Sequence, residues 1–334
     1  MFNIFMYAFN AVVPILLLVL LGYALRRIGF AGEDFFKKAN ALVFRVFLPL
    51  LLFCNVYDIE SLSDVHWGDV GYIACVVVVL ALIGTVLARL FVPERLQKGP
   101  FIQCVFRSNC AILGIPLAEA LGGTAALAFT AVATAVTIPL FNTLAVIVLS
   151  YYADKKPSVK ATLLRTLKNP LILGVAAGLL VLAVRSFLPQ TADGAPVFSL
   201  ERDCKFLFSA LRMAAQAASP LALVVIGARF DFSAVRSLLR PIAIGTVCRI
   251  VLAPALAIGG AVALTQWGVL QFTPVEIPAL LAVFGSPIAV SSAVMVGEIG
   301  GDDQLASQFV VWTSAFSLFT IFVTVFLLRS FAYL

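Results

Sequence analysis

The chain has 334 residues, of which 62% are hydrophobic and 12% are charged. Soluble domains carry about 25% charged residues, and apolar runs long enough to cross a bilayer recur along this sequence, so a soluble protein is excluded. The formal net charge of +6 comes from basic residues that lie mostly in short segments between the apolar runs. That pattern favours topology signals in a lipid bilayer over binding to nucleic acid.

The apolar runs predict an all-α polytopic membrane protein. We interpret the first run as a span and not as a cleaved signal peptide, because its basic residues follow the apolar stretch. Ten transmembrane helices are expected, at 9–25, 39–57, 70–91, 100–121, 124–151, 169–188, 206–228, 241–264, 276–299 and 304–328.

The distribution of Lys and Arg sets the expected orientation. The segments that join helices 1–2, 3–4, 5–6 and 7–8 hold fifteen of these residues, whereas the remaining segments and the C-terminus hold four. Basic loops stay in the cytoplasm. We therefore expect a multi-pass protein of the cell (inner) membrane with both termini on the non-cytoplasmic side.

The two halves of the sequence resemble each other. A first five-helix repeat at 1–151 is followed by a short basic linker at 152–168 and a second repeat at 169–334. An odd number of spans per half inverts the second copy, as in many secondary transporters. Chance similarity among apolar helices is the alternative explanation.

Two predicted helices carry polar or helix-breaking residues near their midpoints. Aligning the Gly-Gly pair at 122–123 with that at 300–301, an offset of 178 residues, places Asn109 opposite Pro287. Proline breaks a helix, and non-helical backbone at membrane depth survives only against protein or a polar cavity. We therefore expect helices 4 and 9 to be broken and to hold the binding site between them.

The candidate residues fall into two sets. The expected substrate-binding residues are Arg107, Ser108, Asn109, Cys110, Gly285, Ser286, Pro287 and Ser291. The expected kink or gating residues are Pro49, Gly114, Pro116 and Pro220.

Two interpretations fit Arg107. Its planar guanidinium suits a carboxylate ligand, and an arginine near the bilayer centre costs on the order of 3 kcal/mol, which a function usually justifies. Alternatively, it caps the carbonyls of the first half-helix. Arg45 and Arg249 are expected to pair with Glu119 or Glu298 or to line a cytoplasmic vestibule.

The sequence offers no sign of catalysis. No nucleophile–base pair, HExxH motif or phosphate-binding glycine loop occurs, and the cysteines lack a zinc-ligand spacing. No enzyme activity, cofactor or metal is therefore expected.

Four motifs in order resemble the auxin efflux carrier family, which includes bacterial carriers and the plant PIN auxin carriers. They are "NALVFRVFLPLLLF", "FRSNCAILGIPLAEALGG", "NPLILGVAAGLL" and "GSPIAVSSAVMVGEIGGDDQLAS". The resemblance implies the ten-helix fold of bile-acid and sodium/proton carriers. It also implies a scaffold of helices 1, 2, 6 and 7, a transport domain of helices 3–5 and 8–10, and substrate at the crossing of helices 4 and 9.

This chain departs from the plant proteins in two places. Ser108 stands where they have a proline, and the large cytoplasmic loop is missing. A bacterial member is therefore implied, with a small carboxylate such as malate or malonate as substrate rather than auxin.

The leading functional hypothesis is a secondary carrier that moves a small organic anion, a carboxylate such as malate or malonate or an auxin-like acid, by alternating access. The alternative is a sodium- or proton-coupled symporter of the bile-acid type on the same fold. The substrate, the direction, the coupling ion (H⁺ or Na⁺) and a homodimeric state are left open by the sequence.

Overall fold

Helices make up most of the protein. The computed structural model describes residues 2–57, 67–153, 164, 167–187, 199–230, 234–273, 276–331 and 333–334. No strand occurs within those ranges, as expected for an apolar chain whose backbone groups must be satisfied within each segment. The predicted all-α class is thus confirmed, whereas most of the predicted linker at 152–168 lies outside the described residues.

The helices follow the predicted windows in order, and several windows hold two or three of them. The α-helices and short π-helical turns (η) are α1 (Phe2–Arg27), α2 (Glu33–Leu42), η1 (Val43–Phe47), α3 (Leu48–Tyr57), α4 (Trp67–Phe91), α5 (Arg95–Phe106), η2 (Cys110–Gly114), α6 (Ile115–Ala153), α8 (Pro170–Phe187), α9 (Leu200–Asp203), α10 (Lys205–Gln216), α11 (Ala218–Arg229), α12 (Ala234–Val247), η3 (Cys248–Leu252), α13 (Ala253–Gln266), α14 (Glu276–Gly285), α15 (Ser291–Ile299) and α16 (Asp303–Ser330).

Fewer helices than ten qualify as membrane spans by length and apolarity alone. Five of the described helical stretches qualify, and the bent pair within α16 makes a sixth. Helices such as α14, with ten residues, reach only about 15 Å, half of the hydrocarbon core of roughly 30 Å. Such a helix can span the bilayer only together with a second half-helix that continues it. The count of ten spans therefore stays a prediction. The five stretches are Glu33–Tyr57, Gly68–Phe91, Ala125–Ala153, Lys205–Arg229 and Val235–Gln266.

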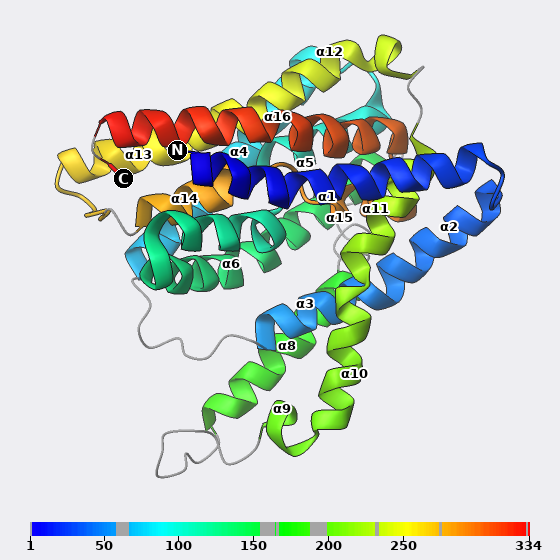
Figure 1. Ribbon diagram of the computed structural model, residues 1–334, viewed down its shortest axis with the longest axis horizontal. Helices are drawn as coiled ribbons and strands as arrows, with labels where there is room; N and C mark the ends of the chain where they lie inside the picture. Colours follow the sequence, from blue (N-terminus) through cyan, green and yellow to red (C-terminus); the bar gives the residue numbers. More distant parts are fainter. Residues whose placement is uncertain are drawn as a thin grey trace.

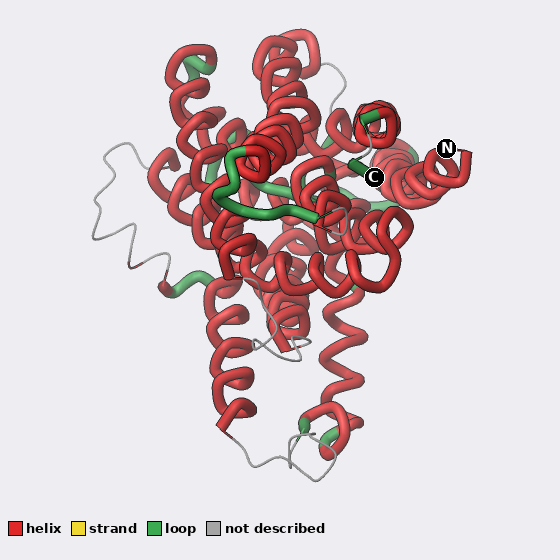
Figure 2. Tube along the Cα trace, turned by 90° about the vertical axis from the view of Figure 1, so that its left-hand side faces the viewer, coloured by secondary structure: helices red, strands yellow, loops and turns green. Residues whose placement is uncertain are grey.

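Two closely packed helix pairs join segments that lie far apart in the sequence. Helix α1 packs against α11, and α3 packs against α8. Figure 1 shows α3, α8, α9 and α10 grouped at one end of the molecule, away from α4, α5, α13 and α16. The quarter-turned view in Figure 2 shows the same end extending below the main body of helices.

Glycines permit the closest of these contacts. A Cβ on Gly22 of α1 would lie 1.9 Å from the carbonyl oxygen of Val224, and one on Gly227 of α11 would lie 1.8 Å from that of Val19. Small residues let helix backbones approach closely in membranes, where packing replaces the hydrophobic effect. The α1–α11 pair is therefore a backbone-to-backbone contact that no larger residue permits at either position.

Candidate functional site

Two helix interruptions meet at the centre of the site. Helix α5 ends at Phe106, and the next helical turn begins at Cys110. Helix α14 ends at Gly285, and α15 begins at Ser291. The backbone N–H of Asn109 donates a 2.8 Å hydrogen bond to the carbonyl of Pro287. The two breaks thus satisfy part of each other's backbone, which permits non-helical chain in an apolar interior.

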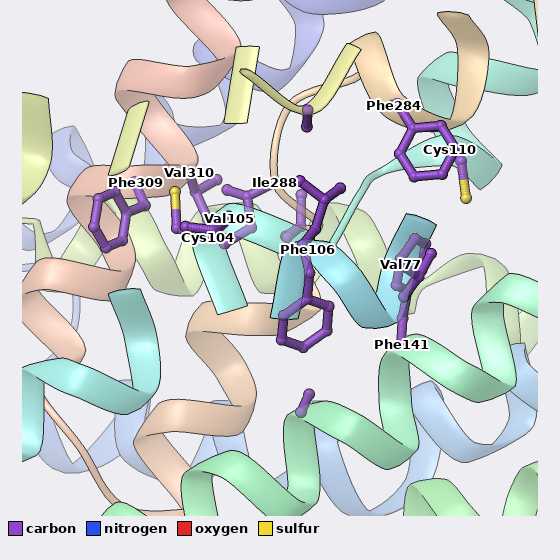
Figure 3. Packing of buried hydrophobic residues seen from close by; sticks show 14 of the residues in the cluster. Val77, Cys104, Val105, Phe106, Cys110, Phe141, Phe284, Ile288, Phe309 and Val310 are labelled. Carbon is purple, nitrogen blue, oxygen red and sulfur yellow. The ribbon is translucent and has the colours of Figure 1, made fainter. Parts of the chain in front are cut away.

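Apolar side chains enclose the meeting point. The rings of Phe106 in α5 and Phe141 in α6 have centroids 6.3 Å apart, and Figure 3 shows both rings together with Phe284 of α14 and Ile288 of the second break. All four residues are buried. Water is therefore restricted around the polar groups of the breaks, which strengthens electrostatic interactions there.

Arg107 is the charged group of the first break. Only 2% of the residue is exposed. One Nη donates to Gln103 Oε1 at 2.9 Å and also contacts the sulfur of Met295. The other Nη donates to Asn142 Oδ1 and to Ser291 Oγ, each at 2.7 Å. All of these partners are neutral, so the guanidinium is held in place without an opposing charge.

Arg249 of η3 lies on the other side of the crossing. It is fully buried, and it donates to the carbonyl oxygen of Val105 at 3.4 Å and to that of Phe284. These carbonyls belong to the last turns of α5 and α14. One cation therefore binds the C-terminal ends of both half-helices, where the helix dipole concentrates negative charge.

A cavity of about 70 Å³ lies beside the first break. It is bordered by the starts of η2 and α15 and by α6 on one side, and by α3, α8 and α11 on the other. Its lining consists of Leu48, Leu51, Leu52, Asn55, Arg107, Ser108, Asn109, Cys110, Ile138, Phe141, Asn142, Leu171, Ser219, Ala289, Val290 and Ser291.

Two polar side chains in this lining are buried and lack a partner. Among the described residues, no hydrogen-bond partner lies near Ser108 Oγ or Asn109 Nδ2. An unsatisfied buried donor costs about 1–3 kcal/mol, and such groups in a native structure call for a specific explanation. Together with Arg107, they supply adjacent donors at one wall of the cavity.

The predicted binding residues separate into two groups. Arg107, Ser108, Asn109, Cys110 and Ser291 line the cavity. Gly285, Ser286 and Pro287 are not part of that lining: Ser286 Oγ turns back to its own helix and donates to the Ala282 carbonyl at 2.6 Å. A direct contact of those three residues with substrate remains a prediction.

The predicted kink residues all lie in or beside a change of helix. Pro49 is the second residue of α3, directly after η1, and Pro220 lies in the first turn of α11, after the interruption at Ala217. A proline cannot donate to the carbonyl four residues before it, which accounts for the weak helix on its N-terminal side. Gly114 is the last residue of η2, and Pro116 is the second residue of α6.

The charged residues near the crossing pair differently from expectation. Arg249 binds backbone carbonyls rather than Glu119 or Glu298. Arg45 does lie near Glu298, with Nη2 and Oε2 3.8 Å apart, but its side chain is largely exposed, so this pair adds little stability.

Sequence reasoning missed several polar residues of the site. Asn142, Asn55 and Ser219 line the cavity, and Gln103 and Met295 bind Arg107. Asn142 and Asn55 are single amides in apolar runs, and a polar residue facing lipid would be costly. That signal could have identified them. Within the described residues, no group of three or more His, Cys, Asp or Glu could hold a metal ion.

Comparisons with known proteins point to transport. A family model described as "Membrane transport protein" matches residues 7–325. A protein of Methanothermobacter thermautotrophicus, described as an uncharacterized transporter, is 40% identical over 63 residues. That match covers 18% of this chain and 21% of the archaeal protein, so the likeness to it is restricted to about a fifth of each.

Proposed function

The chain belongs to the membrane transport protein family, that of the auxin efflux carriers, and on that premise we propose that it is a secondary transporter of a small organic anion. The substrate binds in the cavity at the crossing of the two broken helices. Alternating access then exposes that cavity to each side of the membrane in turn.

The charge balance at the crossing carries this proposal. A helix terminus is equivalent to roughly half an elementary charge, positive at the N-terminus and negative at the C-terminus. Arg249 contacts two C-terminal ends, so these charges roughly cancel. Arg107 lines the cavity that the N-terminal ends of η2 and α15 border, so all contributions there are positive. An anion is the ligand that balances them.

The donor geometry favours a carboxylate. A guanidinium matches the two oxygens of a carboxylate, and Ser108 Oγ and Asn109 Nδ2 add neutral donors without other partners among the described residues. The cavity is small, with a volume of about 70 Å³. A small dicarboxylate such as malate or malonate is therefore favoured over an auxin-sized acid.

The helix contacts support a division into scaffold and transport domain. The cavity separates α3, α8 and α11 from the breaks and α6. We assign α1, α2, α3, α8, α10 and α11 to the scaffold and the remaining long helices to the moving domain. Sliding of one group against the other alters access to Arg107 without unfolding either break.

Two observations support the proposed inverted repeat of ten spans. In the proposed repeat, α1 corresponds to α8 and α11 corresponds to α3. The α1–α11 pair therefore corresponds to the α8–α3 pair, and both pairs are closely packed. In addition, Gly123 and Gly301, which match at the offset of 178 residues, both have positive φ, of 67° and 138°. The topology that we propose, with both termini outside the inner membrane, rests on the count of basic residues alone.

Transport by proteoliposomes tests the function. The purified protein is reconstituted with internal unlabelled malonate, malate or indole-3-acetate, and counterflow of the same labelled acid is measured with and without Na⁺ or a pH gradient. We expect exchange of a small dicarboxylate to exceed that of indole-3-acetate. Lack of exchange for every carboxylate of a wider panel would contradict the proposed substrate class.

Two variants test the site. Arg107→Gln removes the charge, and Asn109→Ala removes an unpartnered amide. Truncating a partner of a buried charge costs about 2–5 kcal/mol, so we expect Arg107→Gln to lower transport at least about 30-fold. Gln266→Ala is the matched control, because it removes an exposed amide outside the cavity lining. Equal transport by Arg107→Gln, Asn109→Ala and the parent would refute the site.

A further inference from the structure

A second and larger cavity lies where four helices end or begin. It has a volume of about 540 Å³ and is lined by the end of α1, the start of α2, the end of α11 and the start of α16. Cavities of about 300–1,000 Å³ are typical of small-molecule sites. Its size is sufficient for a phosphate-bearing headgroup.

Positive charge predominates in this cavity. Arg26, Arg27 and Arg229 line it together with two carboxylates, those of Glu33 and Asp303. Both carboxylates already have cationic partners: Glu33 pairs with Lys37 at 2.8 Å, and Asp303 pairs with Arg229.

Arg26 and Arg27 supply the excess charge. Arg27 Nε donates to the hydroxyl of Tyr23 at 3.0 Å, and its guanidinium lies 5.2 Å from the centre of that ring. A tyrosine hydroxyl orients the group without neutralising it. Glu33 also attracts Arg26, more weakly than it attracts Lys37, but both carboxylates of the lining are bonded to other cations. The cavity therefore keeps a surplus of positive charge, a suitable site for a phosphate.

An apolar surface leads to these arginines. Leu17, Leu21 and Ala24 of α1 and then Ile28 are exposed at helical spacing on one face, and Phe30 is exposed just beyond the helix. In a membrane protein such a stripe faces acyl chains. A soluble phosphate compound would make no contact with this apolar face. A phospholipid can place its phosphate at the arginines and its acyl chains along the apolar face at the same time.

We propose that this cavity binds the headgroup of an anionic phospholipid, with Arg26 and Arg27 on the phosphate and the acyl chains along the exposed face of α1. Basic pockets between membrane helices recognise such headgroups. The site is separate from the transport cavity, and the inference does not depend on the proposed substrate.

Lipid-dependent thermal stability tests the proposal. The protein in detergent receives phosphatidylglycerol, phosphatidylcholine of the same acyl chains, or soluble glycerol 3-phosphate. A ligand that binds only the folded protein raises the apparent Tm, and we expect a rise of at least about 3 °C with phosphatidylglycerol alone. An equal rise with phosphatidylcholine overturns the charge recognition. An equal rise with glycerol 3-phosphate overturns the lipid assignment.

A matched pair of double variants locates the effect. Arg26→Gln with Arg27→Gln should abolish the phosphatidylglycerol shift. Arg89→Gln with Arg236→Gln makes the same charge change at two exposed arginines outside the cavity lining and should leave the shift intact. An unchanged shift in the first variant, or an equal loss in both, overturns the proposed site.

Native mass spectrometry supplies a readout that is independent of unfolding. Phosphatidylglycerol should remain bound to the parent protein at least about tenfold more often than phosphatidylcholine, because the choline cation offsets the phosphate charge and is repelled by the arginines. Ile28→Ser with Phe30→Ser removes exposed apolar side chains and should reduce the retention of phosphatidylglycerol itself. Equal retention of the two lipids by the parent overturns the proposal.

Discussion

The two helix breaks occupy matching places in the halves of the sequence but differ in their chemistry. The first break presents Arg107, Ser108 and Asn109 to the cavity. The second turns Ser286 back onto its own helix and contributes the Pro287 carbonyl, which accepts from Asn109. Two similar helix interruptions thus provide a polar wall at one break and a structural support at the other.

This difference shows how two similar helix breaks can meet while only one of them carries a charged side chain. A second arginine on the cavity side of the crossing would place a like charge close to Arg107 in an apolar interior, at a high energetic cost. Arg249 lies instead on the C-terminal side, against the Val105 and Phe284 carbonyls. The comparison therefore predicts which substitutions damage both breaks, one break, or neither.

Replacement of Arg249 should have the largest effect, because this side chain serves both breaks. Arg249→Met removes two hydrogen bonds from a charged donor, each contributing about 1.5–3 kcal/mol. We expect a loss of folding free energy of about 3–5 kcal/mol, measured as lower thermal stability and a lower yield of monodisperse protein. Arg236→Met, at an exposed position, is the control. A parent-like Tm for Arg249→Met would show that the two breaks do not depend on it.

An added methyl group should distinguish the breaks by their packing. A Cβ on Gly114 would lie 2.4 Å from the carbonyl oxygen of Ala282, which is backbone, whereas one on Gly285 would meet the movable end of Leu281 at 2.6 Å. We expect Gly114→Ala to destabilise by about 1–3 kcal/mol and Gly285→Ala by less. Thermal unfolding of the two variants side by side provides the measurement, and the reverse order would contradict this packing argument.

The two serines test the polar difference directly. Ser108→Ala should raise the KM for the transported anion about tenfold, since it removes a hydrogen bond to a charged ligand. Ser286→Ala should leave the KM unchanged, because its hydroxyl already donates to Ala282. Initial rates in proteoliposomes decide between them. A KM raised equally in both variants would mean that the second break also binds substrate through its side chain.

Replacement of Pro287 should have the smallest effect. Pro287→Ala keeps the carbonyl that accepts from Asn109, and the meeting of the breaks is preserved. We expect a change in stability below about 1 kcal/mol and transport within about threefold of the parent, from the same unfolding and uptake measurements. A severe loss of transport would assign the proline ring itself a role in the conformational change.

Much of the architecture could be predicted from local patterns. Helix interruptions were expected near Asn109 and Pro287, and the described chain is non-helical at both. Proline and short polar side chains act on their own backbone, so their effect is visible in a short stretch of sequence. The family resemblance rested on such stretches as well, and the family model over 7–325 confirms it.

The partners of the buried charges could not be predicted in the same way. Arg249 was expected to pair with a carboxylate or to line a cytoplasmic vestibule, and it binds backbone carbonyls, one of them 144 residues away. The sequence does not show which backbone carbonyl is available as an acceptor, because every residue carries one. Only the position of a carbonyl at the end of a broken helix leaves it without a helical partner. Pattern reasoning therefore finds the charge but not its partner.

By itself, the sequence determined the class of the protein. Apolar runs, loop charges and helix-breaking residues act through the bilayer and the local backbone, and they need no long-range contact to be effective. The tertiary structure alone decided that the polar residues of one break line a cavity while those of the other do not. That outcome depends on contacts such as Arg107 with Ser291, 184 residues apart, which form only when the two interrupted helices cross.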